Sequence, residues 1–189
     1  MGDFLYLKWY CEKEGKRTMR VHMETGRLIL RNLIPEDCHE AFKWCGDPVV
    51  NKFMIYPLYT NEEDLREWIS SLNPDDSDDY SLGFVLKETG ELIGSGGLVY
   101  KPDQDVWVIG YNIRADKWGN GYVPEAMQGL MDYTRKSREI KVIEGQFAVD
   151  NNKSKRVMEK LGMTYNRDGE YQKLDGSVSF QSKAYRREF

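Results

Sequence analysis

Two glycines, Gly119 and Gly121, lie between a strand-like segment that ends at Ile113 and a helix-like segment that begins at Val123. A glycine loop that leads from a strand into a helix exposes backbone N–H groups, and the helix adds the positive end of its dipole. These features favour a negatively charged oxygen group such as a phosphate. A tight connection between two elements is the alternative interpretation, and the two glycines alone do not decide between them.

Pro124 separates this loop from the common nucleotide-binding motifs. The dinucleotide pattern G-x-G-x-x-G requires glycine or alanine where this chain has Pro124, and the P-loop pattern G-x-x-x-x-G-K-[ST] does not occur in the sequence. Proline suits the first turn of a helix because its missing N–H would have no partner there. The loop therefore predicts a phosphate-containing ligand of another class.

Three segments around the loop resemble one family when they are taken together. They are Ile109-Gly110-Tyr111-Asn112-Ile113, then Lys117 to Tyr122 with Glu125-Ala126, then Asn151-x-x-Ser154 followed by Glu159 to Met163. In this order they resemble the GNAT acetyltransferase superfamily, and within it the branch that acetylates the N-terminal amine of ribosomal proteins. The resemblance covers roughly residues 26 to 187. It implies an α/β fold with a mixed, mostly antiparallel sheet of about six or seven strands, a splayed parallel pair, and about four helices on both faces.

The resemblance also implies a reaction and a donor site. An acetyl group would pass from acetyl-coenzyme A to a primary amine by direct attack in a ternary complex, without a metal. The pyrophosphate would lie on the amides of residues 118–123, and the pantetheine arm would pair with the backbone of Tyr111 and Ile113. The implied cofactor-binding residues are Tyr111, Asn112, Ile113, Trp118, Gly119, Asn120, Gly121, Tyr122, Val123, Asn151 and Ser154. Asn151 is also a sound helix N-cap, which is its structural alternative.

The catalytic groups are harder to assign. An alkylamine with a pKa near 10 is protonated at pH 7, so a base or a water chain has to remove a proton. Many relatives carry glutamate just before the Ile-Gly-Tyr segment, but this chain has Val108. Asp105 is the candidate base, acting through water, although a solvated surface position is its alternative. Ser154 is the hydroxyl available to the leaving thiolate, because the position that often holds tyrosine in relatives is Met158, and Asn151 completes the predicted catalytic set.

By resemblance, the amine acceptor would contact the loop from Phe53 to Pro57 together with the C-terminal hairpin. Phe53 and Tyr56 are the candidate substrate-binding residues. Their aromatic character leaves the acceptor open among a protein N-terminus, a polyamine, an aminoglycoside and a small metabolite. Val108 and Met158 also leave a second hypothesis open, a non-catalytic acyl-coenzyme A sensor or interaction module.

Composition limits the class of protein. With 189 residues, 40% hydrophobic residues and a net charge of −4, the chain predicts one globular domain and disfavours a nucleic-acid partner. Cys11, Cys38 and Cys45 form no C-x-x-C pair, so we expect reduced thiols and neither a disulfide framework nor a zinc site. No segment has the pattern of a secretory leader or a membrane span, so we expect a cytoplasmic monomer or homodimer that does not bind a membrane.

The elements that must position these groups follow from periodicity and turn residues. We expect an N-terminal extension over residues 1–23, forming a hairpin, and the acetyltransferase domain over residues 24–189. Within the domain we expect a strand at 28–30, helices opening at Pro35 and after Asn61, strands at 80–86, 92–100, 106–114 and 141–149, and helices carrying Val123 to Tyr133 and Val157 to Leu161. Two Asp-Gly turns, Asp168-Gly169 and Asp175-Gly176, are expected in the C-terminal tail.

Overall fold

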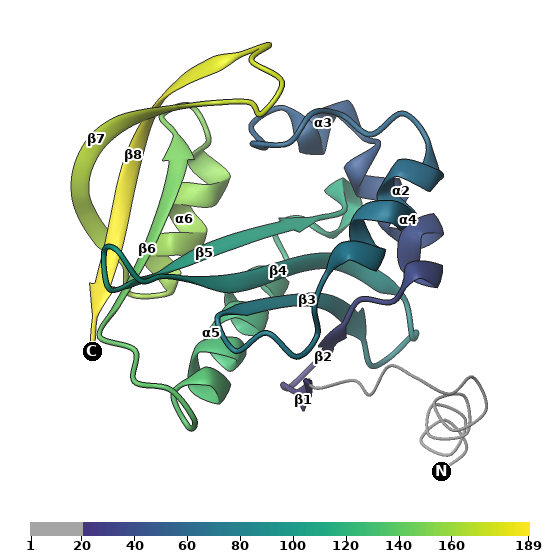
Figure 1. Ribbon diagram of the computed structural model, residues 1–189, viewed down its shortest axis with the longest axis horizontal. Coiled ribbons are helices and arrows are strands. Elements are labelled where there is room, and N and C mark those ends of the chain that lie inside the picture. Colours follow the sequence, from purple (N-terminus) through teal and green to yellow (C-terminus); the bar gives the residue numbers. More distant parts are fainter. Residues whose placement is uncertain (1–20) are drawn as a thin grey trace.

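The computed structural model describes residues 21–189, which form a single sheet with helices on both faces (Figure 1). The sheet has eight strands in the order β1-β2-β3-β4-β5-β6-β8-β7. Their bounds are β1 His22–Glu24, β2 Leu28–Asn32, β3 Asp79–Leu86, β4 Leu92–Lys101, β5 Val106–Ile113, β6 Val142–Ala148, β7 Thr164–Gln172 and β8 Ser179–Glu188. All neighbouring strands are antiparallel except β5 and β6, which are parallel. The predicted fold class is confirmed, with β1 as an additional edge strand.

Five α-helices lie in the described part of the chain, one more than the sequence predicts. They are α2 Cys38–Cys45, α3 Pro48–Asn51, α4 Glu62–Ser71, α5 Tyr122–Thr134 and α6 Asn152–Lys160, and the short 3-10 helices η1 Pro35–Asp37 and η2 Ala115–Lys117 accompany them. The extra helix is α3. Pro48 opens α3, and the Asp47 side chain caps it by accepting from the Val49 amide at 2.8 Å.

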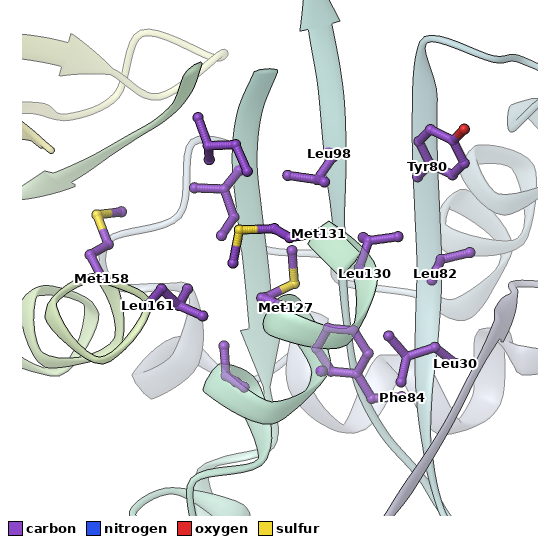
Figure 2. Packing of buried hydrophobic residues seen from close by; sticks show 14 of the residues in the cluster. Leu30, Tyr80, Leu82, Phe84, Leu98, Met127, Leu130, Met131, Met158 and Leu161 are labelled. Atoms are coloured by element: carbon purple, nitrogen blue, oxygen red, sulfur yellow. The ribbon is translucent and has the colours of Figure 1, made fainter. Parts of the chain in front are cut away.

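One face of the sheet is covered by α5 and α6, which form the larger hydrophobic core with it. Figure 2 shows Met127, Leu130 and Met131 of α5 packed against the strands, with Met158 and Leu161 from α6 and its C-terminal end beside them. All five side chains are almost completely buried. Burial of each such side chain contributes about 1.5–3 kcal/mol, so this layer holds the end of β5 and the start of α5 in fixed positions.

The opposite face is covered by α2 and α4 over part of its width. Trp44, Leu65 and Ile69 are fully buried in this second core. Trp68 of α4 is 38% exposed. Leu65 and Ile69 are one helical turn apart and define the buried stripe, and residue 68 falls at its border.

The C-terminal hairpin differs from the sequence prediction at one of its two turns. β7 continues through Asp168-Gly169, and Gly169 pairs with Ser182 of β8. The expected turn at Asp168-Gly169 is therefore wrong, because pairing along the whole of β8 outweighs the local turn preference of the dipeptide. The second turn is confirmed at Asp175-Gly176, where Gly176 has a φ of +74°.

The predicted N-terminal hairpin and Cys11 lie outside the described residues except for residues 21–23. Val21 is 1% exposed in the larger core, and β1 pairs with β2. The expected boundary between residues 23 and 24 therefore falls inside a strand of the sheet. Cys38 and Cys45 are free and buried, as expected of small apolar side chains on one helix.

Leu130 provides a test of the core on the α5 face. It is fully buried, so Leu130→Ala should lower the free energy of unfolding by about 2–5 kcal/mol, through lost burial and the cavity left behind. Leu174→Ala is the matched control, because Leu174 is 74% exposed, and it should change stability by less than about 0.5 kcal/mol. Urea denaturation followed by circular dichroism measures both, and equal midpoints for the two variants would contradict this description of the core.

Candidate functional site

The two parallel strands, β5 and β6, separate soon after they meet. Their register consists of Trp107 opposite Ile143 and Val108 opposite Glu144. Beyond this pair the two strands diverge, as Figure 1 shows, and leave a gap in the hydrogen-bonded sheet. From Ile109 onward β5 keeps its hydrogen-bonded neighbour β4 but has none on the β6 side. Backbone N–H and C=O groups require partners, so this side of β5 is suited to an extended ligand that pairs like a strand.

The glycine loop lies at the open end of this gap. Gly119 and Gly121 have φ values of +82° and +78°, and Gly121 is the N-cap of α5. Other L-residues in this conformation cost about 1–2 kcal/mol, which explains the two glycines. A Cβ added at Gly119 would meet no heavy atom within 4 Å, so the loop opens outward at that point. Exposed amides at the start of a helix are an arrangement that binds phosphate groups.

Residues of the β1–β2 turn hold the glycine loop through contacts that the sequence did not predict. We call these contacts, made by Thr25 and Arg27 with Glu125 and Asn120, the clamp. The Glu125 carboxylate accepts from Thr25 Oγ1 at 2.6 Å and from the Arg27 amide and Nε, each at 2.7 Å. Arg27 Nη1 donates to the Asn120 carbonyl at 2.9 Å, and its guanidinium lies 4.5 Å from the Tyr122 ring centre. Burial raises the pKa of Glu125, but the hydrogen bonds from Thr25 and Arg27 outweigh it, so the pKa lies below its usual value.

The predicted residues of α6 meet β5 across the gap. The Asn151 side chain accepts from the Ser154 amide at 3.2 Å, which confirms Asn151 as the N-cap, and its Nδ2 donates to Ser154 Oγ at 3.3 Å. The Tyr111 hydroxyl donates to the Ser154 carbonyl at 3.2 Å. Burial raises the pKa of Tyr111 to about 12, so this hydroxyl keeps its proton near neutral pH. Tyr111, Asn151 and Ser154 therefore form one connected group.

The start of α6 also contacts the glycine loop. Lys153 Nζ lies 3.2 Å from the centre of the Trp118 ring, and the Trp118 indole donates to the Ile113 carbonyl at 3.1 Å. A cation over an aromatic face is attracted by the ring. The loop, the end of β5 and the first turn of α6 are thus linked through two side chains.

On the opposite face of β5, the structure joins a predicted donor-site residue to a predicted acceptor-site residue. Ser95 Oγ donates to Asn112 Oδ1, and Asn112 Nδ2 donates to the Tyr56 hydroxyl, both at 2.8 Å. Burial raises the pKa of Tyr56 well above its ordinary value, so the phenol is neutral. Phe53 packs edge-on against Phe180 of β8 with ring centres 5.7 Å apart. The acceptor loop therefore contacts both β5 and the C-terminal hairpin.

A buried lysine in the hairpin turn, also missed by the sequence prediction, fixes this loop. Lys173 is 9% exposed, and its Nζ donates to the Asn51 carbonyl and Oδ1 at 2.9 and 2.8 Å and to the Met54 carbonyl at 2.9 Å. The Leu174 amide donates to the Ile55 carbonyl at 2.8 Å. Burial lowers the pKa of Lys173. Figure 1 shows the tip of the β7–β8 hairpin reaching over α3, which these contacts explain.

Neither Asp105 nor Met158 brings a polar group to Ser154. Asp105 lies in the β4–β5 turn, 56% exposed at its side chain, at the other end of β5 from the glycine loop. It accepts from the Tyr100 hydroxyl at 2.8 Å and from Lys141 Nζ at 3.1 Å, and both contacts lower the pKa of its carboxyl. Met158 is 2% exposed inside the core and brings no polar atom to the gap.

Residues 21–189 are the part of the chain that the structure describes. In that part of the chain no group of three or more histidine, cysteine, aspartate or glutamate side chains is arranged to hold a metal ion. No helix described there has the length and apolar character needed to cross a membrane.

A family model described as the acetyltransferase (GNAT) domain matches residues 27–164. The chain belongs to this family. The uncharacterized N-acetyltransferase p20 of Bacillus licheniformis is 29% identical over 160 residues, which cover 82% of this chain and 89% of p20. The GNAT assignment makes the chain an N-acetyltransferase, and it favours the enzyme over the alternative of a non-catalytic module.

Two solved GNAT structures share the fold of this enzyme. The microcin C7 self-immunity acetyltransferase MccE, in complex with acetyl-coenzyme A and AMP, has a TM-score of 0.73 at 22% identity, covering 87% of this chain and 93% of its own. The ribosomal L7/L12 acetyltransferase RimL, in complex with coenzyme A, has a TM-score of 0.75 at 19% identity, covering 89% and 98%. At these identities the likeness concerns the fold.

The clamp on the glycine loop provides a test of its role. Arg27→Met removes the side-chain contacts to Glu125 and Asn120, so amide hydrogen exchange at residues 119–122 should become faster. Binding of acetyl-coenzyme A, measured by calorimetry, should weaken about ten-fold, because one charged hydrogen bond to the loop is lost. Arg66→Met is the control, since Arg66 lies on α4 with its side chain 43% exposed and paired with Glu63 at 3.7 Å. Unchanged exchange and affinity in Arg27→Met would contradict a positioning role for the clamp.

Proposed function

We propose that this GNAT enzyme transfers an acetyl group from acetyl-coenzyme A to a primary amine by direct attack while both substrates are bound. The observation that carries the proposal is the position of β5 between two binding regions. Its open side faces the gap that leads to the glycine loop, and Asn112 on its other face holds Tyr56 of the acceptor loop. Donor and acceptor would therefore meet at the same strand.

The donor region fits acetyl-coenzyme A in its chemistry. The loop of residues 118–123 is open beside Gly119 and leads into the N-terminus of α5, which suits a pyrophosphate, and Arg27 supplies a positive charge beside it. The open edge of β5 near Tyr111 and Ile113 suits the amide groups of the pantetheine arm. Acetyl-coenzyme A would supply an activated acetyl group as a thioester. The acetyl-coenzyme A and coenzyme A complexes of MccE and RimL support this assignment.

We assign the leaving-group side of the reaction to the group around Ser154. Asn151 would orient the Ser154 hydroxyl, to which its Nδ2 already donates, and this hydroxyl would meet the sulfur as the C–S bond breaks. Tyr111, which keeps its proton and lies beside Ser154, is a second hydroxyl at the same place. Asp105 lies in the β4–β5 turn, beyond the end of the gap at which β5 and β6 are still paired. It therefore keeps only the water-relayed role predicted for it.

The acceptor region is framed by Phe53, Tyr56 and the hairpin. We infer that the amine approaches on this face, past the aromatic side chains, toward the exposed Gly110 of β5. The acceptor is either the N-terminal amine of a protein or a small-molecule amine. A cytoplasmic location, a monomeric or homodimeric state and the lack of a nucleic-acid partner stay predictions from the sequence.

Ligand-dependent stability tests the donor. Acetyl-coenzyme A at one hundred times its dissociation constant should stabilise the protein by about 2.7 kcal/mol, seen as a rise in thermal midpoint, because it binds the folded state only. NAD and ATP are the controls and should produce no rise, since the loop lacks both nucleotide motifs. Release of free thiol across a panel of amines then reports turnover. Stabilisation by NAD or ATP instead of acetyl-coenzyme A would contradict the assignment.

A further inference from the structure

The gap between β5 and β6 has a closed end, where the two strands are still paired. At this end β6 has a carboxylate side chain. Val108 on β5 pairs in register with Glu144 on β6, and this is the last parallel pair before the strands separate. Residues paired directly across neighbouring strands project to the same face of a sheet. The Glu144 side chain therefore lies next to that of Val108, at the point where a ligand running along β5 from the glycine loop would end.

The neighbouring residue shows which face Glu144 occupies. A Cβ added at Gly145 would collide with Met158 of α6, so Gly145 faces the α6 side and Glu144 faces the opposite side. The opposite side is the one where Asn112 holds Tyr56. It is also the side of Gly110, which is exposed and where an added Cβ would meet no heavy atom within 4 Å. Glu144 thus borders the open surface by which an amine would reach β5.

The surroundings of the carboxylate hold it in one orientation. Its side chain is 14% exposed, and it accepts from Arg167 Nη1 and Nη2 at 2.7 and 2.5 Å and from Asn166 Nδ2 at 3.2 Å. An ionised carboxylate offers about four acceptor positions, so these three donors leave one free. The Arg167 side chain is 55% exposed, which places the ion pair at the rim of the open face.

We propose that Glu144 is the general base that takes the proton from the attacking amine, an inference that rests on the proposed function. The amine reacts in its neutral form: as the nitrogen bonds to the acetyl carbon, the carbon–sulfur bond breaks, and coenzyme A leaves as a thiolate that takes up a proton from water. The proton lost by the nitrogen passes to the free acceptor position of Glu144 and then to water, which restores the carboxylate. Val108 contributes no titratable group, and Asp105 lies on an exposed turn beyond the closed end, so Glu144 is the carboxylate placed for this step.

Charge-neutral substitution tests the proposal. Glu144→Gln should lower kcat by about 10²–10⁴-fold, the contribution of a positioned base, while the dissociation constant of acetyl-coenzyme A changes less than about two-fold. In Glu144→Ala, added formate should restore part of kcat, because formate can occupy the vacated carboxylate position. Glu170→Gln is the control. Glu170 is an exposed carboxylate on β7, the strand that carries Arg167, and it follows Gly169 on the face opposite to Glu144, so this variant should retain full activity.

Arg167→Met separates catalysis from a purely structural ion pair. This variant keeps the carboxylate and removes its partner, so kcat should fall less than about ten-fold. Equal losses in Glu144→Gln and Arg167→Met, with no formate rescue of Glu144→Ala, would overturn the proposal and leave Glu144 as a structural residue. Full activity of Glu144→Gln would overturn it as well. Wild-type protein that binds acetyl-coenzyme A but releases no thiol with any amine would overturn the proposed function itself, and this inference with it.

Discussion

The divergence of β5 from β6 after Val108 leaves one side of β5 without its hydrogen-bonded neighbour, and the other features of the site are arranged around this gap. A sheet interrupted at its centre loses ladder hydrogen bonds, so its two halves need other support. The α5–α6 layer supplies it, because its core side chains, Met127 and Met158 among them, pack beneath both halves. This packing therefore supports the strands on both sides of the gap, and the contacts of Tyr111 with Ser154 and of Trp118 with Lys153 add to it.

Both ends of the gap are fixed by side chains from distant parts of the chain. Arg27 and Glu125 hold the glycine loop at the open end, and Arg167 holds Glu144 at the closed end. Each contact joins a charged pair that is partly shielded from water, where such pairs are stronger than on an open surface. The distance between the two ends is set by the part of β5 from Val108 to Ile113, which at about 3.3 Å per residue spans about 17 Å.

Local signals predicted much of the fold. Caps such as Asn61 and Asn151, the glycines of the loop and the apolar periodicities correctly placed most helices and strands, because these signals act within a few residues. The splayed parallel pair and acetyl-coenzyme A as the donor were predicted from the family resemblance. Asp168-Gly169 failed as a turn because cross-strand pairing over the whole hairpin outweighs a dipeptide preference.

The missed residues have a common physical cause. Arg27 meets Glu125 across 98 positions and Lys173 meets Asn51 across 122, so neither pair leaves a periodic or motif-like trace in one sequence. Glu144 is likewise defined by its register with Val108, which only the parallel pairing of two strands reveals. Sequence patterns therefore identified the loop, while the groups that complete the site depend on tertiary contacts.

Lys173 places a positive charge among carbonyl oxygens of the acceptor loop, with its Nζ within 3.0 Å of the carbonyls of Asn51 and Met54. The loop is thereby organised by a cation that belongs to the chain itself. Ordering a flexible segment costs roughly 1–2 kcal/mol per residue in conformational entropy, and here folding has already met that cost. An incoming amine thus encounters a preformed wall, so more of its interaction energy remains for selecting one acceptor over another.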